Sequence, residues 1–285
     1  MTAGTFTSRL APVGAMAATL ALLGGGIASA QDQDPGSPDG GASGSLSSTS
    51  FGSSGNPVAE PLTFDGWNRC PVAGQDFGTC VTVIVRGGQM KIGGLDVPIP
   101  DGSLKVSGGV NYVEDGNDWK DVFVPDAGTN FGVTSTPITI PGGAFGIDTP
   151  LNLTQIQATV EAVGTPTVNV LDANLSMPVR LKLQNKLLGN NCYLGSPTNP
   201  VTLNLASSGN PRSQPIGGGT VGAVFPATPH TDTTFAVPAA TGCGPLGSLN
   251  WAVNLRAGTP SPTGRNSLTA TSDVYNVAAY EVAPS

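Results

Sequence analysis

The clearest pattern in the chain is an alternation of apolar and polar residues with a period of two. Between Gln155 and Ala162, every second residue is apolar, starting at Ile156. The segments 179–183 and 201–205 alternate in the same way. This period places all the apolar side chains of a strand on one face. The pattern therefore predicts antiparallel strands with one buried and one solvated face.

Short β-branched or alternating segments separated by glycine and proline predict further strands along most of the chain. In one of them, Gly87-Gly88 is expected to make the turn of a hairpin between 80–86 and 89–92. Gly108-Gly109 is expected to bend or bulge another. The remaining predicted strands cover residues 103–107, 110–113, 136–147 (with a turn), 166–171, 176–183, 267–271 and 274–282.

One segment, 246–257, has a helical pattern. Leu249, Ala252, Val253 and Leu255 would form a small apolar face, and Gly258 follows as a helix-terminating residue. The composition agrees with few helices, because the chain has 40 glycines and 25 prolines and only 11% charged residues. We predict an all-β protein, an antiparallel β-sandwich or distorted barrel with one short helix.

The N-terminal region divides into two parts. Residues 1–30 carry one arginine, Arg9, then an apolar run and Ala28-Ser29-Ala30, the features of a cleavable signal peptide. Residues 31–60 are rich in glycine and serine, so they are expected to form a disordered linker. Residues 61–285 would then be the secreted β domain. No later run is long and apolar enough to predict a membrane span in the mature chain.

Four cysteines in an exported chain predict two disulfides. Of the three pairings, we favour Cys70–Cys80, which closes a local loop, and Cys192–Cys243. Cys192 lies in a turn-rich segment between two alternating strands, and Cys243 lies in a tight turn, Gly242-Cys243-Gly244. The second bridge would therefore clamp a corner of the β domain.

A pattern of short motifs runs through residues 188–196, 199–201, 235–238, 242–244 and 258–266. Together these motifs resemble exported proteins of actinobacteria of unknown function. The signal peptide, the N-terminal cysteine pair and the Pro-Gly-Gly turn at Pro141 fit the same group. The resemblance implies secretion and an all-β domain with two disulfides, and it assigns no catalytic residue.

The sequence offers little catalytic chemistry. His230 is the single histidine, so any Ser-His-Asp triad would have to use it, and it lies in a Pro/Thr-rich segment expected to be a solvated loop. No Gly-x-Ser-x-Gly motif occurs. The acidic segment 114–121 lacks the spacing of an EF-hand, which favours an exposed acidic turn over a calcium site. We predict no metal and no cofactor. The net charge of −7 without a basic cluster disfavours nucleic acid.

Aromatic side chains are the best candidates for ligand contact. We expect Trp119, in the acidic turn, to be exposed and to contact a ligand, and Trp67 and Trp251 to pack in the core. The expected function is a non-catalytic binding or structural role, secreted or at the cell envelope. A cell-wall polymer, a lipid and another envelope protein are the open partner classes. The alternatives are an extracellular hydrolase of a wall polymer and a carrier of an apolar, lipid-like ligand held between sheets.

Overall fold

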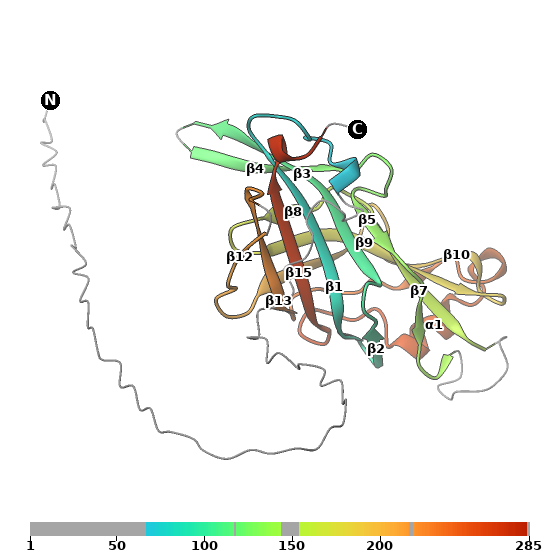
Figure 1. The fold of residues 1–285 in the computed structure, drawn as a ribbon. Coiled ribbons are helices and arrows are strands. Elements are labelled where there is room, and N and C mark those ends of the chain that lie inside the picture. Colours follow the sequence, from blue (N-terminus) through green and yellow to red (C-terminus); the bar gives the residue numbers. More distant parts are fainter. Residues whose placement is uncertain (1–66, 117, 144–153, 217–218, 284–285) are drawn as a thin grey trace, which may run out of the picture. The chain divides into compact units, whose positions relative to one another are not determined.

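The structure is a computed structural model that describes residues 67–116, 118–143, 154–216 and 219–283. The predicted signal peptide and linker lie outside these residues and stay predictions. The described chain is built from antiparallel strands, with a single α-helix among the described residues (Figure 1). None of the described helices is long and apolar enough to cross a membrane.

The first sheet has long strands in the order β13-β15-β1-β3-β4. The short strands β2, β5 and β12 pair with β1, β3 and β13 respectively. The strands of this sheet are β1 (Thr79–Ile92), β2 (Leu95–Ile99), β3 (Leu104–Asp115), β4 (Asp118–Pro125), β5 (Val133–Ser135), β12 (Gln214–Pro215), β13 (Gly222–Asp232) and β15 (Ser267–Ala278).

The second sheet is organised around one long strand, β9. One half of β9 lies between β7 and β10, and the other half lies between β8 and β11. Strands β6 and β14 extend the sheet beyond β7 and β10. The strands of this sheet are β6 (Ile138–Ile140), β7 (Ile156–Ala162), β8 (Thr167–Asn169), β9 (Asn174–Asn185), β10 (Gly189–Leu194), β11 (Val201–Ser207) and β14 (Ala240–Thr241).

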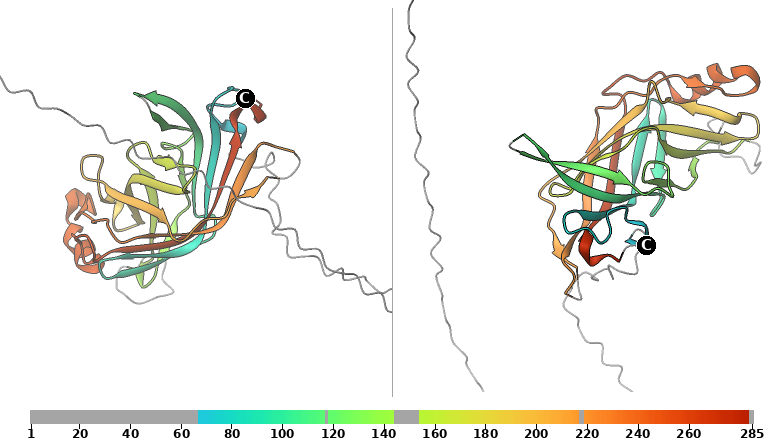
Figure 2. Two further views of the ribbon diagram at one scale, coloured as in Figure 1. Left: turned by 90° about the vertical axis from the view of Figure 1, so that its left-hand side faces the viewer. Right: turned by 90° about the horizontal axis from the view of Figure 1, so that it is seen from above.

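Strand β11 connects the two sheets. Its first five residues pair with β9, and Ala206 and Ser207 pair with β13 of the first sheet. The sheet does not close into a barrel, and the main hydrophobic core is made of buried residues from both sheets. Figure 2 shows this arrangement from two further sides. The predicted antiparallel, sandwich-like all-β fold is confirmed.

The period-two alternation behaves as predicted. In β7 and β9, buried residues alternate strictly with half-buried ones over most of each strand. The two strands are in register, with Ala158 opposite Leu183 and Val160 opposite Leu181. Because opposite residues in a sheet share a face, these four side chains all point into the core.

The prediction of a hairpin turn at Gly87-Gly88 is wrong. Strand β1 continues through both glycines, and its pairing with β15 shifts register between Val85 and Gly87, which marks a β-bulge. At Gly88 a side chain would collide with the carbonyl oxygen of Thr269 on β15. The glycines therefore allow two strands to approach closely. The turn itself comes later, between Ile92 and Leu95.

Other boundaries also differ from the sequence prediction. Cys192 lies within strand β10, not in a turn, and the segments 267–271 and 274–282 belong largely to the single strand β15. The helix α1 (Asn250–Ala257) is shorter than predicted, because a short 3-10 turn, Pro245–Gly247, precedes it. Gly258 ends the helix in the left-handed conformation, as predicted.

A second core lies at one end of the first sheet. Trp67, which is 1% exposed, packs there with Cys70, Cys80 and the strand residues Tyr275 and Val277. The Cys70–Cys80 disulfide joins the 3-10 turn Trp67–Arg69 and the residues that follow it to the start of β1. This core therefore covers part of the sheet that the main core leaves open.

Candidate ligand-binding cavity

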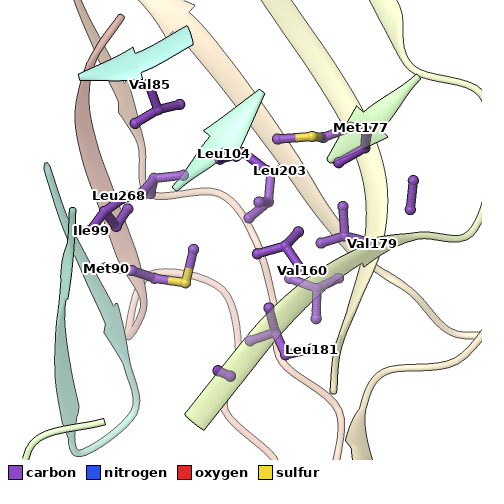
Figure 3. Packing of buried hydrophobic residues seen from close by; sticks show 14 of the residues in the cluster. Val85, Met90, Ile99, Leu104, Val160, Met177, Val179, Leu181, Leu203 and Leu268 are labelled. Atoms are coloured by element: carbon purple, nitrogen blue, oxygen red, sulfur yellow. The ribbon is translucent and has the colours of Figure 1, made fainter. Parts of the chain in front are cut away.

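An apolar cavity of about 220 Å³ lies in the main core. The first sheet contributes residues of β1, β2, β3 and β15, the second contributes β6, β7, β9, β10 and β11, and α1 forms a further wall. Figure 3 shows Met90, Ile99 and Leu268 from the first sheet facing Leu203 and Val160 from the second. Among the described lining residues there is no carboxylate, hydroxyl, thiol or imidazole.

Small residues explain why this part of the core stays open. Ala158 on β7, Ala270 on β15, and Ala252 and Ala257 on α1 line the cavity among leucine, isoleucine and valine neighbours. An alanine between larger residues leaves the space that a longer side chain would fill. The lining residues thereby forgo packing contacts that a filled core would give them.

Among the described lining residues, two have polar side chains, Asn185 and Arg256. Asn185 is at the end of β9, where its Nδ2 donates to the carbonyl oxygen of Gln155 and its Oδ1 accepts from the backbone of Leu187. Arg256, in the last turn of α1, donates from Nε to the carbonyl of Gly143 at 3.2 Å and from Nη2 to that of Pro141 at 3.0 Å. Both residues are half-buried, so the polar part of the described lining is partly accessible to solvent.

The predicted disulfide Cys192–Cys243 is present and holds the wall formed by α1. Cys243 lies just before the helix, and its backbone N–H donates to Oδ1 of Asn250 in the first turn of α1. One turn further along, Oδ1 of Asn254 accepts from the backbone of Ala240. The disulfide and the two asparagines therefore fix the helix against β10 and β14.

The sequence context of His230 predicts a solvated loop, and this prediction is wrong. His230 lies on β13 and is 3% exposed, and its Nε2 is 2.6 Å from Oγ of Ser272 on β15. Burial disfavours the charged imidazole and lowers the pKa of His230 below its usual value. The pair borders a separate space of about 10 Å³, which is room for one water molecule at most.

A triad at His230 is not assembled. The nearest candidate acid in sequence, Asp232, accepts hydrogen bonds from Asn204 and Thr234 with its two oxygens. Ser272 is 2% exposed, so no substrate reaches its hydroxyl. The Ser-His contact is therefore a buried structural hydrogen bond.

The acidic segment 114–121 forms the end of a β-hairpin instead of a loop. Strand β3 runs to Asp115 and β4 starts at Asp118. Beyond Val110 the two strands pair only with each other, and the hairpin projects from the other strands in Figure 1. The described residues include no group of three or more acidic, histidine or cysteine side chains placed to hold a metal ion.

Trp119 is 67% exposed, on β4 of this hairpin, and does not line the cavity. Tyr112, Val113 and Val122 of the same hairpin are also exposed. The structure thus separates the predicted ligand-contacting residue from the cavity. Trp251 was expected in the core, but α1 turns it outward, and it is also 67% exposed.

Comparison with known proteins gives no family for this chain. No protein-family model, no curated protein and no solved structure matches it. The resemblance to exported actinobacterial proteins therefore stays a prediction from sequence. The cavity has to be interpreted from its own geometry and chemistry.

Proposed function

We propose that the protein is a non-catalytic carrier that binds the apolar part of a small lipid-like molecule between its sheets. The observation that supports this proposal is the apolar cavity of about 220 Å³. An engineered cavity of about 150 Å³ in another protein binds benzene, so a space of this size has room for a chain of about eight to ten carbons. A secreted location, also a proposal, agrees with the two disulfides and would place the carrier outside the cytoplasm.

The cavity's chemistry supports binding over catalysis. Its described lining offers no acid, base or nucleophile to a bound molecule. Glu161, one of the few glutamates, lies on the opposite face of β7 and forms salt bridges with Arg180 at 2.8 Å and Lys182 at 3.8 Å. We therefore favour a carrier over the hydrolase alternative.

Calorimetric titration with 1-octanol tests the proposal. Burying eight carbons contributes at most about 6 kcal/mol, so we expect a Kd no tighter than about 40 µM and a negative heat-capacity change. The matched control ligand is 1,8-octanediol, whose second hydroxyl would have to enter the apolar end of the cavity. Absence of octanol binding up to its solubility, or equal binding of the diol, would contradict the carrier proposal.

The projecting hairpin favours a second candidate function, attachment to an envelope polymer. Its exposed apolar or aromatic side chains lie on both faces of the hairpin, Tyr112 and Trp119 on one face and Val113 and Val122 on the other. The face with Tyr112 and Trp119 is suited to contact. Co-sedimentation with purified cell wall would measure this binding. We expect Trp119→Ser to reduce co-sedimentation with cell wall while octanol binding stays unchanged. Equal co-sedimentation of wild type and variant would contradict the attachment proposal.

A further inference from the structure

We propose that the ligand is an amphiphile with an anionic head group, and that Arg256 binds this group at the opening of the cavity. This inference rests on the carrier proposed above and specifies its ligand class. It follows from three observations on Arg256: its position on the helix, its hydrogen bonds and its lack of a carboxylate partner among the described residues.

The position of Arg256 is one that an apolar residue normally occupies. The cavity-lining residues of α1 and of its N-cap, Leu249, are spaced at i, i+3, i+4, i+7 and i+8, the spacing of a core-facing helical stripe. Arg256 is at i+7 of this stripe, between apolar neighbours. The residues that line the cavity from this stripe are Leu249, Ala252, Val253, Arg256 and Ala257.

The outer face of α1 shows that solubility does not explain this charge. Trp251 and Leu255 are 67% and 78% exposed on that face. The helix thus places large apolar side chains in solvent and its one cation beside an apolar cavity. A charge half-removed from water has a desolvation cost, which an anionic ligand would offset.

The hydrogen bonds of Arg256 hold the guanidinium in place and leave donors for a ligand. A guanidinium has five N–H groups. Nε–H and one Nη2–H are used by the carbonyls of Gly143 and Pro141, both neutral acceptors. The three remaining N–H groups include both on Nη1. A fixed guanidinium with donors to spare is suited to charge-assisted hydrogen bonds with a carboxylate.

Arg256 differs from the other arginines in the described part of the chain. Arg69, Arg86 and Arg180 each form a salt bridge with a carboxylate at 2.7–2.9 Å. Two more arginines, at 212 and 265, are exposed. Arg256 is half-buried, and among the described residues no carboxylate lies within salt-bridge distance of it. Arg256 therefore differs from all of them, because it is half-buried and still has no carboxylate partner among the described residues.

The size of the cavity completes the ligand description. A chain of about eight to ten carbons fits the apolar interior, and the head group would lie at Arg256, where the lining becomes polar. Octanoate has this chain length and a carboxylate that a guanidinium binds through two parallel hydrogen bonds. A medium-chain fatty acid is thus the simplest molecule of the proposed class.

Titration with three ligands that have the same eight-carbon alkyl chain and different head groups tests the inference. Octanoate, 1-octanol and octylamine are compared at pH 7 by calorimetry, with acetate as the head-group control. We expect octanoate to bind about tenfold more tightly than octanol, octylamine to bind more weakly than octanol, and acetate not to bind. In Arg256→Gln the octanoate and octanol affinities should become equal, so the tenfold preference is lost when the two ligands are compared within the variant itself.

Two further variants separate head-group binding from a structural role of Arg256. Arg256→Lys keeps the positive charge and should keep part of the octanoate preference. Arg265→Gln, at an exposed arginine, should keep all of it. Equal binding of octanoate and octanol by the wild type, or an unchanged preference in Arg256→Gln, would overturn the head-group inference and leave the carrier proposal standing. Failure of all three eight-carbon ligands to bind would overturn both the head-group inference and the carrier proposal.

Discussion

Filling the cavity should stabilise the protein and abolish its capacity for an apolar ligand. Ala158 lies on β7, is buried, and lines the cavity opposite Leu183. Replacing it by leucine adds three carbons directed into the empty space. At about 0.8 kcal/mol per buried CH₂, the addition contributes about 2.4 kcal/mol. Fixing the leucine side chain costs about 0.5–1 kcal/mol, so the expected net gain is about 1.5–2 kcal/mol.

The measurement is thermal unfolding together with octanol titration. For a domain of this size, the gain should raise Tm by about 3–8 °C. The added carbons occupy space that the ligand needs, so octanol affinity should fall at least tenfold. Stability and binding should thus change in opposite directions, as expected when function prevents tighter packing.

A matched control lies on the same strand and face. Ala162 is also buried, four residues along β7, but it does not line the cavity. Ala162→Leu should overpack the core and lower stability by about 1–3 kcal/mol. If Ala158→Leu were as destabilising as Ala162→Leu, or if it were stabilising but bound octanol normally, the cavity at Ala158 would not be a ligand site.

Three further predictions concern the frame around the cavity. Cys192→Ser should lower stability by about 4 kcal/mol and Tm by about 10 °C, and should weaken octanol binding because α1 loses its anchor; an unchanged melting curve under strong reductant would refute this. Gly88→Ala should lower Tm through its collision with β15, whereas Gly94→Ala, where a Cβ has open space, should not; equal melting temperatures for the two would contradict the close approach. Burial lowers the pKa of His230 in the folded protein. As the pH drops below about 6.5, the unfolded chain therefore binds a proton at this histidine more readily than the folded protein does, and wild-type stability falls. Urea unfolding at pH 7.5 and 5.5 should therefore show a smaller stability advantage over His230→Gln at the lower pH, and a constant advantage would contradict this sign.

Much of the fold could be predicted from the alternation of residues. In β7 the apolar positions alone identify the strand and its buried face, because a half-buried strand in an antiparallel sheet produces that period. The pattern fails where contacts distant in sequence decide the structure. Gly87-Gly88 reads locally as a turn, but close packing against β15 makes it a bulge.

Strand β13 shows a second limit of the sequence. Its inward residues Thr228, His230 and Asp232 are polar, so hydrophobicity suggests a solvated loop. His230 and Asp232 have hydrogen-bond partners that are distant in sequence, Ser272 and Asn204, and the local pattern does not reveal them. A buried polar strand is recognisable only when these partners are known.

The candidate site was the least predictable part. The sequence pointed to Trp119, because an aromatic residue in an acidic turn is expected to be exposed. A cavity, in contrast, depends on the combined volumes of side chains from many segments, and no single segment specifies them. One signal was present: on the predicted helix, Arg256 falls at the spacing of the apolar stripe that starts at Leu249. Leu255, which was assigned to that stripe, faces solvent instead.

The most direct test of the central claim is a crystal structure of the protein with 1-octanol. We predict continuous density for the alkyl chain between Met90, Leu181 and Leu203, with the hydroxyl directed toward Arg256. An interior filled by repacked side chains, or octanol bound only at the surface, would contradict the account.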